Sequence, residues 1–182
     1  MKAIILCGLP ATGKTFIRNK LREGLKAPYE YSLDDIVEDF CINTRTSFDD
    51  IYGKAVSGAR SLCDIGLEAA IRNERDIIWD QTNTSRAKRM RILDLIPKDY
   101  SIECHYIRMT NREEVMRRIA ERTLRRIPMT IFNKMVGDMV EPDIYREPFA
   151  SVTTYDMDGN VLMFDKPSDE IIDWIKRRAS ND

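Results

Sequence analysis

Apolar residues follow two alternating patterns along this chain. Short and nearly continuous apolar runs are typical of strands buried on both faces of a sheet, and they predict strands at residues 2–7, 29–32, 76–80 and 101–107. Apolar residues that recur every three or four positions predict helices at residues 14–25, 48–71 and 85–96, from Asn111 into an arginine-rich segment, and between Pro128 and Pro142. Two later runs, 152–155 and 161–164, flank Asp158-Gly159 and predict a hairpin, with a closing helix from Ser168.

The longest predicted helix, 48–71, follows Ser47, which together with Asp50 resembles a capping box. Three glycines lie inside this helix: Gly53, Gly58 and Gly66. Because a glycine costs a helix about 1 kcal/mol relative to alanine, we expect all three to mark close packing against a neighbouring element.

Strands that alternate with helices predict an α/β fold with a mostly parallel sheet covered by helices on both faces, in three layers. Ligands in such folds bind at the carboxyl ends of the strands. The 182 residues fit a single domain, 1–182, with a helical, arginine-rich lid at about 111–140 and a C-terminal hairpin and helix at about 150–180.

The composition excludes several classes of protein. With 43% hydrophobic and 32% charged residues, the chain is neither collagen-like nor largely disordered. A net charge of -1 means that any nucleic-acid surface must be local. No apolar run approaches the roughly 18 residues of a membrane span, and the apolar start is too short for a secretory signal, so we expect a cytoplasmic protein without a membrane partner.

The cysteines give no sign of a metal site. None of the four is spaced as Cys-x-x-Cys, and His105 is the single histidine. A zinc-ligand set at the usual spacings is therefore excluded, and we expect reduced, buried thiols.

One motif carries strong chemical information because it lies between a predicted strand and a predicted helix. Its pattern is G-x-x-x-x-G-K-[ST], formed by Gly8, Leu9, Pro10, Ala11, Thr12, Gly13, Lys14 and Thr15. Successive backbone N–H groups of such a loop point at phosphate oxygens, and the helix N-terminus adds a favourable dipole. The motif predicts a nucleoside triphosphate, with Lys14 on the β- and γ-phosphates and Thr15 on Mg²⁺, but it does not define the reaction.

Acidic residues follow the next two predicted strands. Asp34 and Asp35 come directly after the second strand, where one of them could act as a general base for a hydroxyl or both could cap a helix. Asp80 ends the third strand, in the place of an acid that assists Mg²⁺. The segment Asp80-Gln81-Thr82-Asn83 could equally serve strand-end turn chemistry.

Basic residues concentrate in two places. Four lie close together at Arg86, Lys88, Arg89 and Arg91, where a solvated helix face is the alternative interpretation. Residues 108–126 contain seven arginines and three glutamates. Arginines on a helical lid can stabilise charge in a phosphoryl-transfer transition state, although most of the seven are expected to be surface charges.

Taken together, these elements resemble the phage-type P-loop polynucleotide 5′-hydroxyl kinases and related phage P-loop kinases over about the first 145 residues. The resemblance lies in the loop at 8–15 and the pair Asp34-Asp35, together with the Asp80 segment followed by Lys88-Arg89, in which Gln81 is an extra residue. It lies also in the spacing of Arg122, six residues before a proline.

The resemblance implies roles for individual residues. Asp34 would be the general base, Lys14 and Arg122 would assist transfer, and Arg122 and Arg126 would contact nucleotide. Thr15 and Asp80 would serve the metal. The substrate would be contacted by Asp35, Thr82, Asn83, Arg86 and Arg89.

The resemblance implies an ATP- and Mg²⁺-dependent transfer of the γ-phosphoryl group to a nucleic-acid hydroxyl, most simply a polynucleotide 5′ end of DNA or RNA. One departure concerns the acceptor: the family has an arginine three residues after its base, and Val37 stands there in this chain. Arg45 or the 86–91 cluster could replace it. The alternatives are a kinase of a hydroxymethylpyrimidine base in DNA, a small-molecule or nucleotide kinase, and a non-catalytic nucleotide-binding module.

Overall fold

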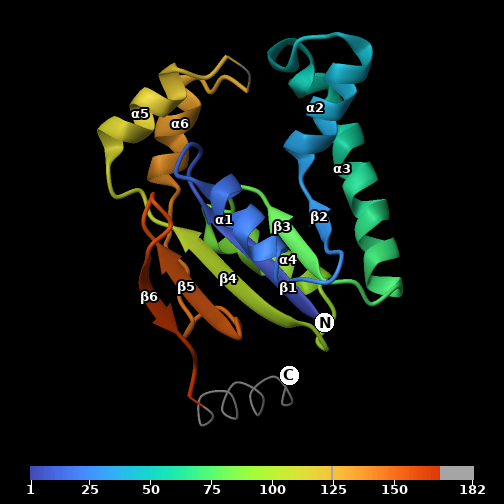
Figure 1. Ribbon diagram of the computed structural model, residues 1–182, viewed down its shortest axis with the longest axis vertical. Coiled ribbons are helices and arrows are strands. Elements are labelled where there is room, and N and C mark those ends of the chain that lie inside the picture. Colours follow the sequence, from blue (N-terminus) through green and yellow to red (C-terminus); the bar gives the residue numbers. More distant parts are fainter. Residues whose placement is uncertain (124, 169–182) are drawn as a thin grey trace.

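The computed structural model describes residues 1–123 and 125–168 (Figure 1). In chain order its elements are β1 (Lys2–Gly8), α1 (Lys14–Arg22), β2 (Tyr29–Tyr31), α2 (Leu33–Thr44), α3 (Phe48–Arg72), β3 (Ile77–Asp80), α4 (Arg86–Leu95), β4 (Ser101–Ile107), α5 (Arg112–Ala120), α6 (Met129–Gly137), β5 (Ser151–Tyr155) and β6 (Val161–Asp165).

The strands form one six-stranded sheet in the order β2-β3-β1-β4-β5-β6. The first five strands in this order are parallel to their neighbours, and β6 is antiparallel to β5. The predicted α/β fold with a mostly parallel sheet is confirmed. Because β1, β2 and β3 are neighbours, the loops after their carboxyl ends meet at one edge of the sheet.

Alternation along the central strand divides the core between the two faces of the sheet. Ile5 and Cys7 of β1 belong to a large cluster that includes residues of α2, α3 and α4, whereas Ile4 and Leu6 pack with Ile17 of α1. In Figure 1, α1 lies in front of the sheet and α4 behind it. Helices therefore cover both faces, which leaves the carboxyl edge for ligands.

The structure differs from the predicted elements in two places. Helix α1 ends at Arg22, three residues before the predicted end, and residues 33–44 form a helix that the sequence analysis did not assign. The buried stripe of α2, which is Leu33, Val37 and Cys41, is hidden in the sequence among acidic residues. The predicted hairpin is confirmed as β5 and β6, whereas the closing helix expected from Ser168 falls on 169–182, outside the described residues.

Helix α3 corrects the prediction made for its glycines. Only Gly66 is closely packed: a Cβ there would lie 2.7 Å from ring carbons of Tyr29, whose hydroxyl donates to the carbonyl of Cys63. A Cβ at Gly53 or Gly58 would meet no atom within 4 Å. Ser47 is the N-cap residue, but its side chain makes no capping hydrogen bond within the described part of the chain.

A matched pair of substitutions on α3 tests this packing. Gly58→Ala is expected to raise the free energy of unfolding by about 0.5–1 kcal/mol, because alanine is the better helix former and meets open space. Gly66→Ala is expected to lower it by about 1–3 kcal/mol, because the Tyr29 ring must move. Urea denaturation of both variants measures the difference, and equal shifts of the same sign would contradict it.

The lid region packs on the phosphate loop through a small core of its own. Helix α5 begins after Asn111, where the sequence predicts a helix start, and the Asn111 side chain caps it by accepting from the backbone N–H of Glu114. Val115 of α5 and Phe132 of α6 are buried with Leu9 of the loop. The described residues of the arginine-rich connection between the two helices, 121–123 and 125–128, thereby lie at the cleft beside the phosphate loop.

The cysteine prediction is confirmed, because Cys7, Cys41, Cys63 and Cys104 are free thiols and buried. Within residues 1–123 and 125–168, no helix has the length and apolar character needed to cross a membrane.

Candidate active site

The loop at residues 8–15 has the backbone conformation that a phosphate cradle requires. It leaves β1 at Gly8 and enters α1 at Gly13, which has a φ of 109°, a left-handed value that side chains other than glycine rarely adopt. Ala11 also has a positive φ, of 64°. The Thr12 hydroxyl donates to the Leu9 carbonyl at 2.8 Å, which fixes the turn from within. The loop therefore fits a triphosphate by its own shape.

Lys14 is held at the mouth of this loop. Its Nζ donates to the carbonyls of Gly8 and Leu9, at 3.0 and 2.8 Å. Burial of the ammonium group lowers the pKa of Lys14, and the nearby Asp80 carboxylate raises it. The side chain is thus anchored at the position from which it can contact phosphate oxygens.

The two acids at the start of α2 have different surroundings. Ser32 caps the helix by accepting from the backbone N–H of Asp35. The Asp35 carboxylate is 2.6 Å from Arg18 and 3.0 Å from Arg125, whereas the closest ion pair of Asp34 is with Arg125 at 3.9 Å. Burial acts to raise the pKa of Asp35, but hydrogen bonds from Arg125 and Arg18 lower it overall. Asp34 is therefore the acid with a carboxylate available to a substrate.

Arg18 was missed by the sequence analysis, although it lies one helical turn after Lys14. Its guanidinium joins Asp35 of α2 to Asp80 of β3, at 2.6 and 2.9 Å. Burial raises the pKa of Asp80, and the charges of Lys14 and Arg18 act against this rise. Arg18 thus fixes the second and third strand ends relative to the phosphate loop.

These residues surround a cleft of about 1320 Å³ between the phosphate loop, helices α2 and α3, and the lid. Lys14, Thr15, Asp34, Asp80 and Arg122 all line it. Burial and the neighbouring Arg125 lower the pKa of Arg122, and Asp34 raises it. Arg122 makes no ion pair within the described residues and lies on the connection after α5, not on a helix. The structure thus brings together the residues to which the sequence analysis gave catalytic roles.

Thr15 and Asp80 fit a magnesium ion that is bound mainly by phosphate and water. Both line the cleft beside Lys14. Among the described residues, no group of three or more histidine, cysteine, aspartate or glutamate side chains could hold a metal by itself. Mg²⁺ in nucleotide sites commonly takes one or two protein ligands in addition to phosphate oxygens, which agrees with this sparse set.

Arg125 is a second residue whose role was missed, although it was counted in the arginine-rich segment. It has a positive φ of 55° and pairs with Asp35 and Glu38 of α2. Its guanidinium also lies 5.5 Å from the centre of the Phe48 ring. Arg125 therefore ties the lid to α2 across the cleft.

The structure contradicts the prediction that Arg89 contacts substrate. Arg89 lies on the inner face of α4 and is fully buried. It donates to both carboxylate oxygens of Glu147 at 2.7 Å and to the Val140 carbonyl at 2.8 Å. Because these donors are used inside the protein, Arg89 holds the segment 140–147 against α4.

Two further predicted substrate contacts use their side-chain donors inside the protein. Asn83 lines the cleft but is 2% exposed, and its side-chain amide donates to the Leu6 carbonyl at 2.7 Å, which is the turn chemistry kept as the alternative. Arg86 donates to the carbonyl of Arg146 and does not line the cleft. Thr82 and Arg126 do line it.

None of the positions considered for an acceptor-binding arginine places an arginine in the cleft. Val37 is fully buried in the core, so its place on α2 faces away from the cleft. Arg45 is the C-cap residue of α2, about 16 Å along the helix from Asp34. Of the 86–91 cluster, only Lys88 lines the cleft.

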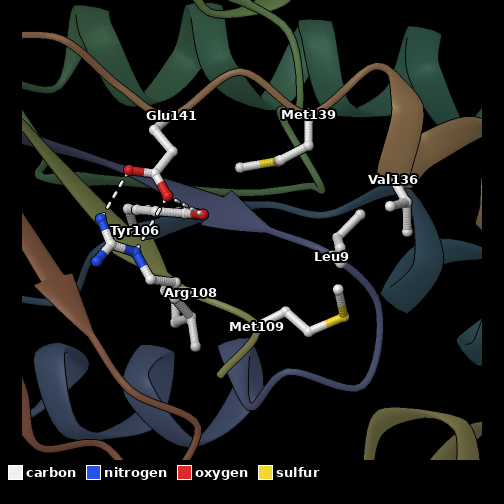
Figure 2. A pocket seen from close by; sticks show the side chains of 8 residues that line it. Leu9, Tyr106, Arg108, Met109, Val136, Met139 and Glu141 are labelled. Carbon is white, nitrogen blue, oxygen red and sulfur yellow. Dashed lines mark hydrogen bonds and ion pairs between the residues drawn. The ribbon is translucent and has the colours of Figure 1, made fainter. Parts of the chain in front are cut away.

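A second, smaller pocket of about 280 Å³ is lined by Leu9, the end of β4, and residues of α6 and the segment after it (Figure 2). Figure 2 shows Tyr106, Arg108 and Glu141 joined by hydrogen bonds, with Met109 and Met139 nearby. Arg108 donates to Glu141 at 2.7 and 3.0 Å and the Tyr106 hydroxyl donates at 3.2 Å, so these bonds fasten the segment after α6 to β4.

The fold and the cleft define a P-loop nucleotide-binding protein of the α/β kinase type. The chain belongs to the AAA domain family, whose model matches residues 4–142. A search of curated proteins found no match.

Solved structures share the whole fold at low sequence identity. A putative kinase from Chloroflexus aurantiacus has a TM-score of 0.60 and 16% identity, over 99% of this chain and 96% of that one. A sugar kinase from Janibacter sp. has a TM-score of 0.56 and 13% identity, over 96% and 92%. A chain of the PezAT toxin–antitoxin system of Streptococcus pneumoniae has a TM-score of 0.53 and 14% identity, over 99% and 86%. These similarities establish the fold but do not identify the acceptor, which must be inferred from the residues of the site.

Proposed function

We propose that this protein is a kinase that transfers the γ-phosphoryl group of ATP to a hydroxyl group of a small molecule. The observation that carries the proposal is the convergence of Lys14, Asp34, Asp80 and Arg122 on one cleft. The AAA domain match supports nucleotide use, and the sugar kinase of the same fold supports a small acceptor.

The geometry supports an in-line transfer. The acceptor oxygen bonds to the γ-phosphorus, the bond from that phosphorus to the β,γ-bridging oxygen breaks, and ADP leaves. Asp34 accepts the proton of the acceptor hydroxyl. Lys14 and Arg122 donate to the phosphate oxygens on which charge develops. Mg²⁺, held by Thr15 and Asp80, would neutralise the phosphates when bound.

A polynucleotide 5′-hydroxyl is the second candidate acceptor. The motifs after β2 and β3 favour it, together with an open cleft whose walls include Lys88 and Arg126. The burial of Val37 counts against it, because the position of the family's acceptor arginine faces the core. For this reason a small acceptor is preferred over a nucleic-acid end, and a hydroxymethylpyrimidine base in DNA is tested beside both.

Phosphoryl transfer can be tested with γ-labelled ATP, Mg²⁺ and a panel of acceptors. The panel contains neutral sugars, sugar acids, nucleosides, nucleoside monophosphates, 5′-hydroxyl DNA and RNA, and DNA containing hydroxymethylpyrimidine. We expect label on a small acceptor and none with Lys14→Met. Label on an oligonucleotide 5′ end or on the internal base would identify a nucleic-acid kinase instead, and ATP binding without any transfer would contradict kinase activity.

A further inference from the structure

Three hydrogen-bond donors that the proposed mechanism does not use line one wall of the cleft. Arg60 comes from α3, Lys88 from the first turn of α4, and Gln81 from the turn after β3. Helices α3 and α4 pack on the same face of the sheet, in the same core cluster. Arg60 and Lys88 therefore come from helices on one side of the sheet, and none of the three donors comes from the lid.

The two cations of this wall differ from three other basic residues near the site, whose charges are neutralised by carboxylates. Arg18, Arg118 and Arg125 are each paired with a carboxylate at 3.0 Å or less. Neither Arg60 nor Lys88 forms an ion pair with any described residue. Because their charges are not neutralised by the protein, the wall favours an anion.

The amide of Gln81 points to the same kind of ligand. Its Nε2 is buried and has no hydrogen-bond acceptor among the described residues. A buried donor without a partner is costly, and a ligand oxygen would satisfy it. Gln81 is also the extra residue within the segment that resembles the Asp-Thr-Asn element of the polynucleotide kinases. This hydrogen-bond donor is therefore a feature of this chain and not of that element.

The spacing along α3 relates this wall to the proposed base. Tyr52, Val56 and Arg60 lie four residues apart and share one helix face, which lines the cleft. Burial and the nearby Asp34 carboxylate raise the pKa of Tyr52 to about 12. Tyr52 therefore lies at the end of this helix face that is near Asp34, the proposed general base. The rise from position 52 to position 60 is about 12 Å, and the long Arg60 side chain shortens that span. Gly53 leaves the space beside this face open.

We propose that the acceptor carries an anionic group, a phosphate or a carboxylate, which binds Arg60, Lys88 and Gln81 while the acceptor hydroxyl faces Asp34. This inference rests on the proposed function and names its substrate class. The span fits a molecule the size of a sugar acid or sugar phosphate, with the hydroxyl and the anion at opposite ends.

Matched probes separate charge from shape. Glucose, gluconate and glucose 6-phosphate share a six-carbon skeleton but are neutral, carboxylated and phosphorylated, respectively. A nucleoside and its 3′-phosphate form the corresponding pair for a nucleic-acid end. Dissociation constants are measured by calorimetry in the presence of Mg²⁺ and a non-hydrolysable ATP analogue.

We expect at least one anionic probe to bind about tenfold or more tightly than its neutral counterpart, as charge-assisted hydrogen bonds predict. Arg60→Met and Lys88→Met should each remove most of this preference and leave the neutral probe unchanged. Lys54→Met is the matched control, because Lys54 is exposed on α3 outside the cleft. Equal affinities within every pair, or a preference that survives in the Arg60→Met/Lys88→Met double variant, would overturn the proposal.

A transfer assay with the same probes keeps the two proposals apart. Transfer that is equally efficient to neutral and anionic probes would overturn the anionic subsite and support the kinase. Tight anion binding that depends on Arg60 and Lys88, without transfer to any probe or to the wider panel, would support the subsite and contradict the kinase. Which anionic probe is preferred identifies the anion as carboxylate, sugar phosphate or nucleotide phosphate.

Discussion

Replacement of Asp34 by asparagine is expected to lower kcat for phosphoryl transfer by about 10²–10⁴-fold, the usual contribution of a general base. The amide keeps the shape of the side chain but cannot take the proton of the acceptor hydroxyl. The dissociation constant for ATP should stay within about twofold of the wild-type value, because Asp34 lies on α2 and not on the phosphate loop. Steady-state kinetics and an ATP titration measure the two effects separately.

Asp39→Asn is the matched control for this prediction, since Asp39 is exposed on the same helix and does not line the cleft. Wild-type kcat in Asp34→Asn would show that Asp34 is not the base. The neighbouring Asp35 is the poorer candidate, because the hydrogen bonds from Arg125 and Arg18 that lower its pKa stabilise the charged form. Loss of activity in Asp35→Asn is therefore expected to come with a displaced Arg18, visible as weaker binding of Mg²⁺-ATP.

The sequence predicts most of the sheet, because strands buried on both faces appear as continuous apolar runs. It also predicts the phosphate loop, whose chemistry is contained in eight consecutive residues. Helix α2 was missed for a physical reason: its buried stripe is narrow, and two of the acids between the stripe residues, Asp34 and Asp35, belong to the site itself. Local patterns therefore identify elements well, except where function places polar residues in them.

The residues that sequence reasoning missed or misplaced are those with distant partners. Arg18 is joined to Asp80, 62 positions away, and Arg89 is joined to Glu147, 58 positions away. Lys88 and Arg89 are adjacent in one basic cluster, but helix phase turns Lys88 toward the cleft and Arg89 into the interior. Charge in a sequence shows that a cation exists, and only the fold shows whether a carboxylate of the protein neutralises it.

The interior position of Arg89 predicts a large effect on stability instead of on substrate binding. Arg89→Met is expected to lower the free energy of unfolding by about 3–5 kcal/mol, because it leaves the buried Glu147 carboxylate without its partner. Glu147→Gln should cost a similar amount by leaving the guanidinium unpaired. The double variant Arg89→Met/Glu147→Gln should recover part of the loss, since neither charge then remains buried alone. Urea denaturation of the four proteins completes the cycle.

Arg91→Met provides the comparison, because Arg91 is exposed on the same helix and should change the free energy of unfolding by no more than about 0.5 kcal/mol. For Arg89→Met, the affinity for the anionic probes should be unchanged at temperatures where the variant is folded. If Arg89→Met has wild-type stability but binds the acceptor weakly, the result would support the sequence-based prediction that Arg89 contacts substrate. The opposite result, low stability with unchanged affinity, would leave Arg60 and Lys88 as the cations through which an anionic acceptor is held.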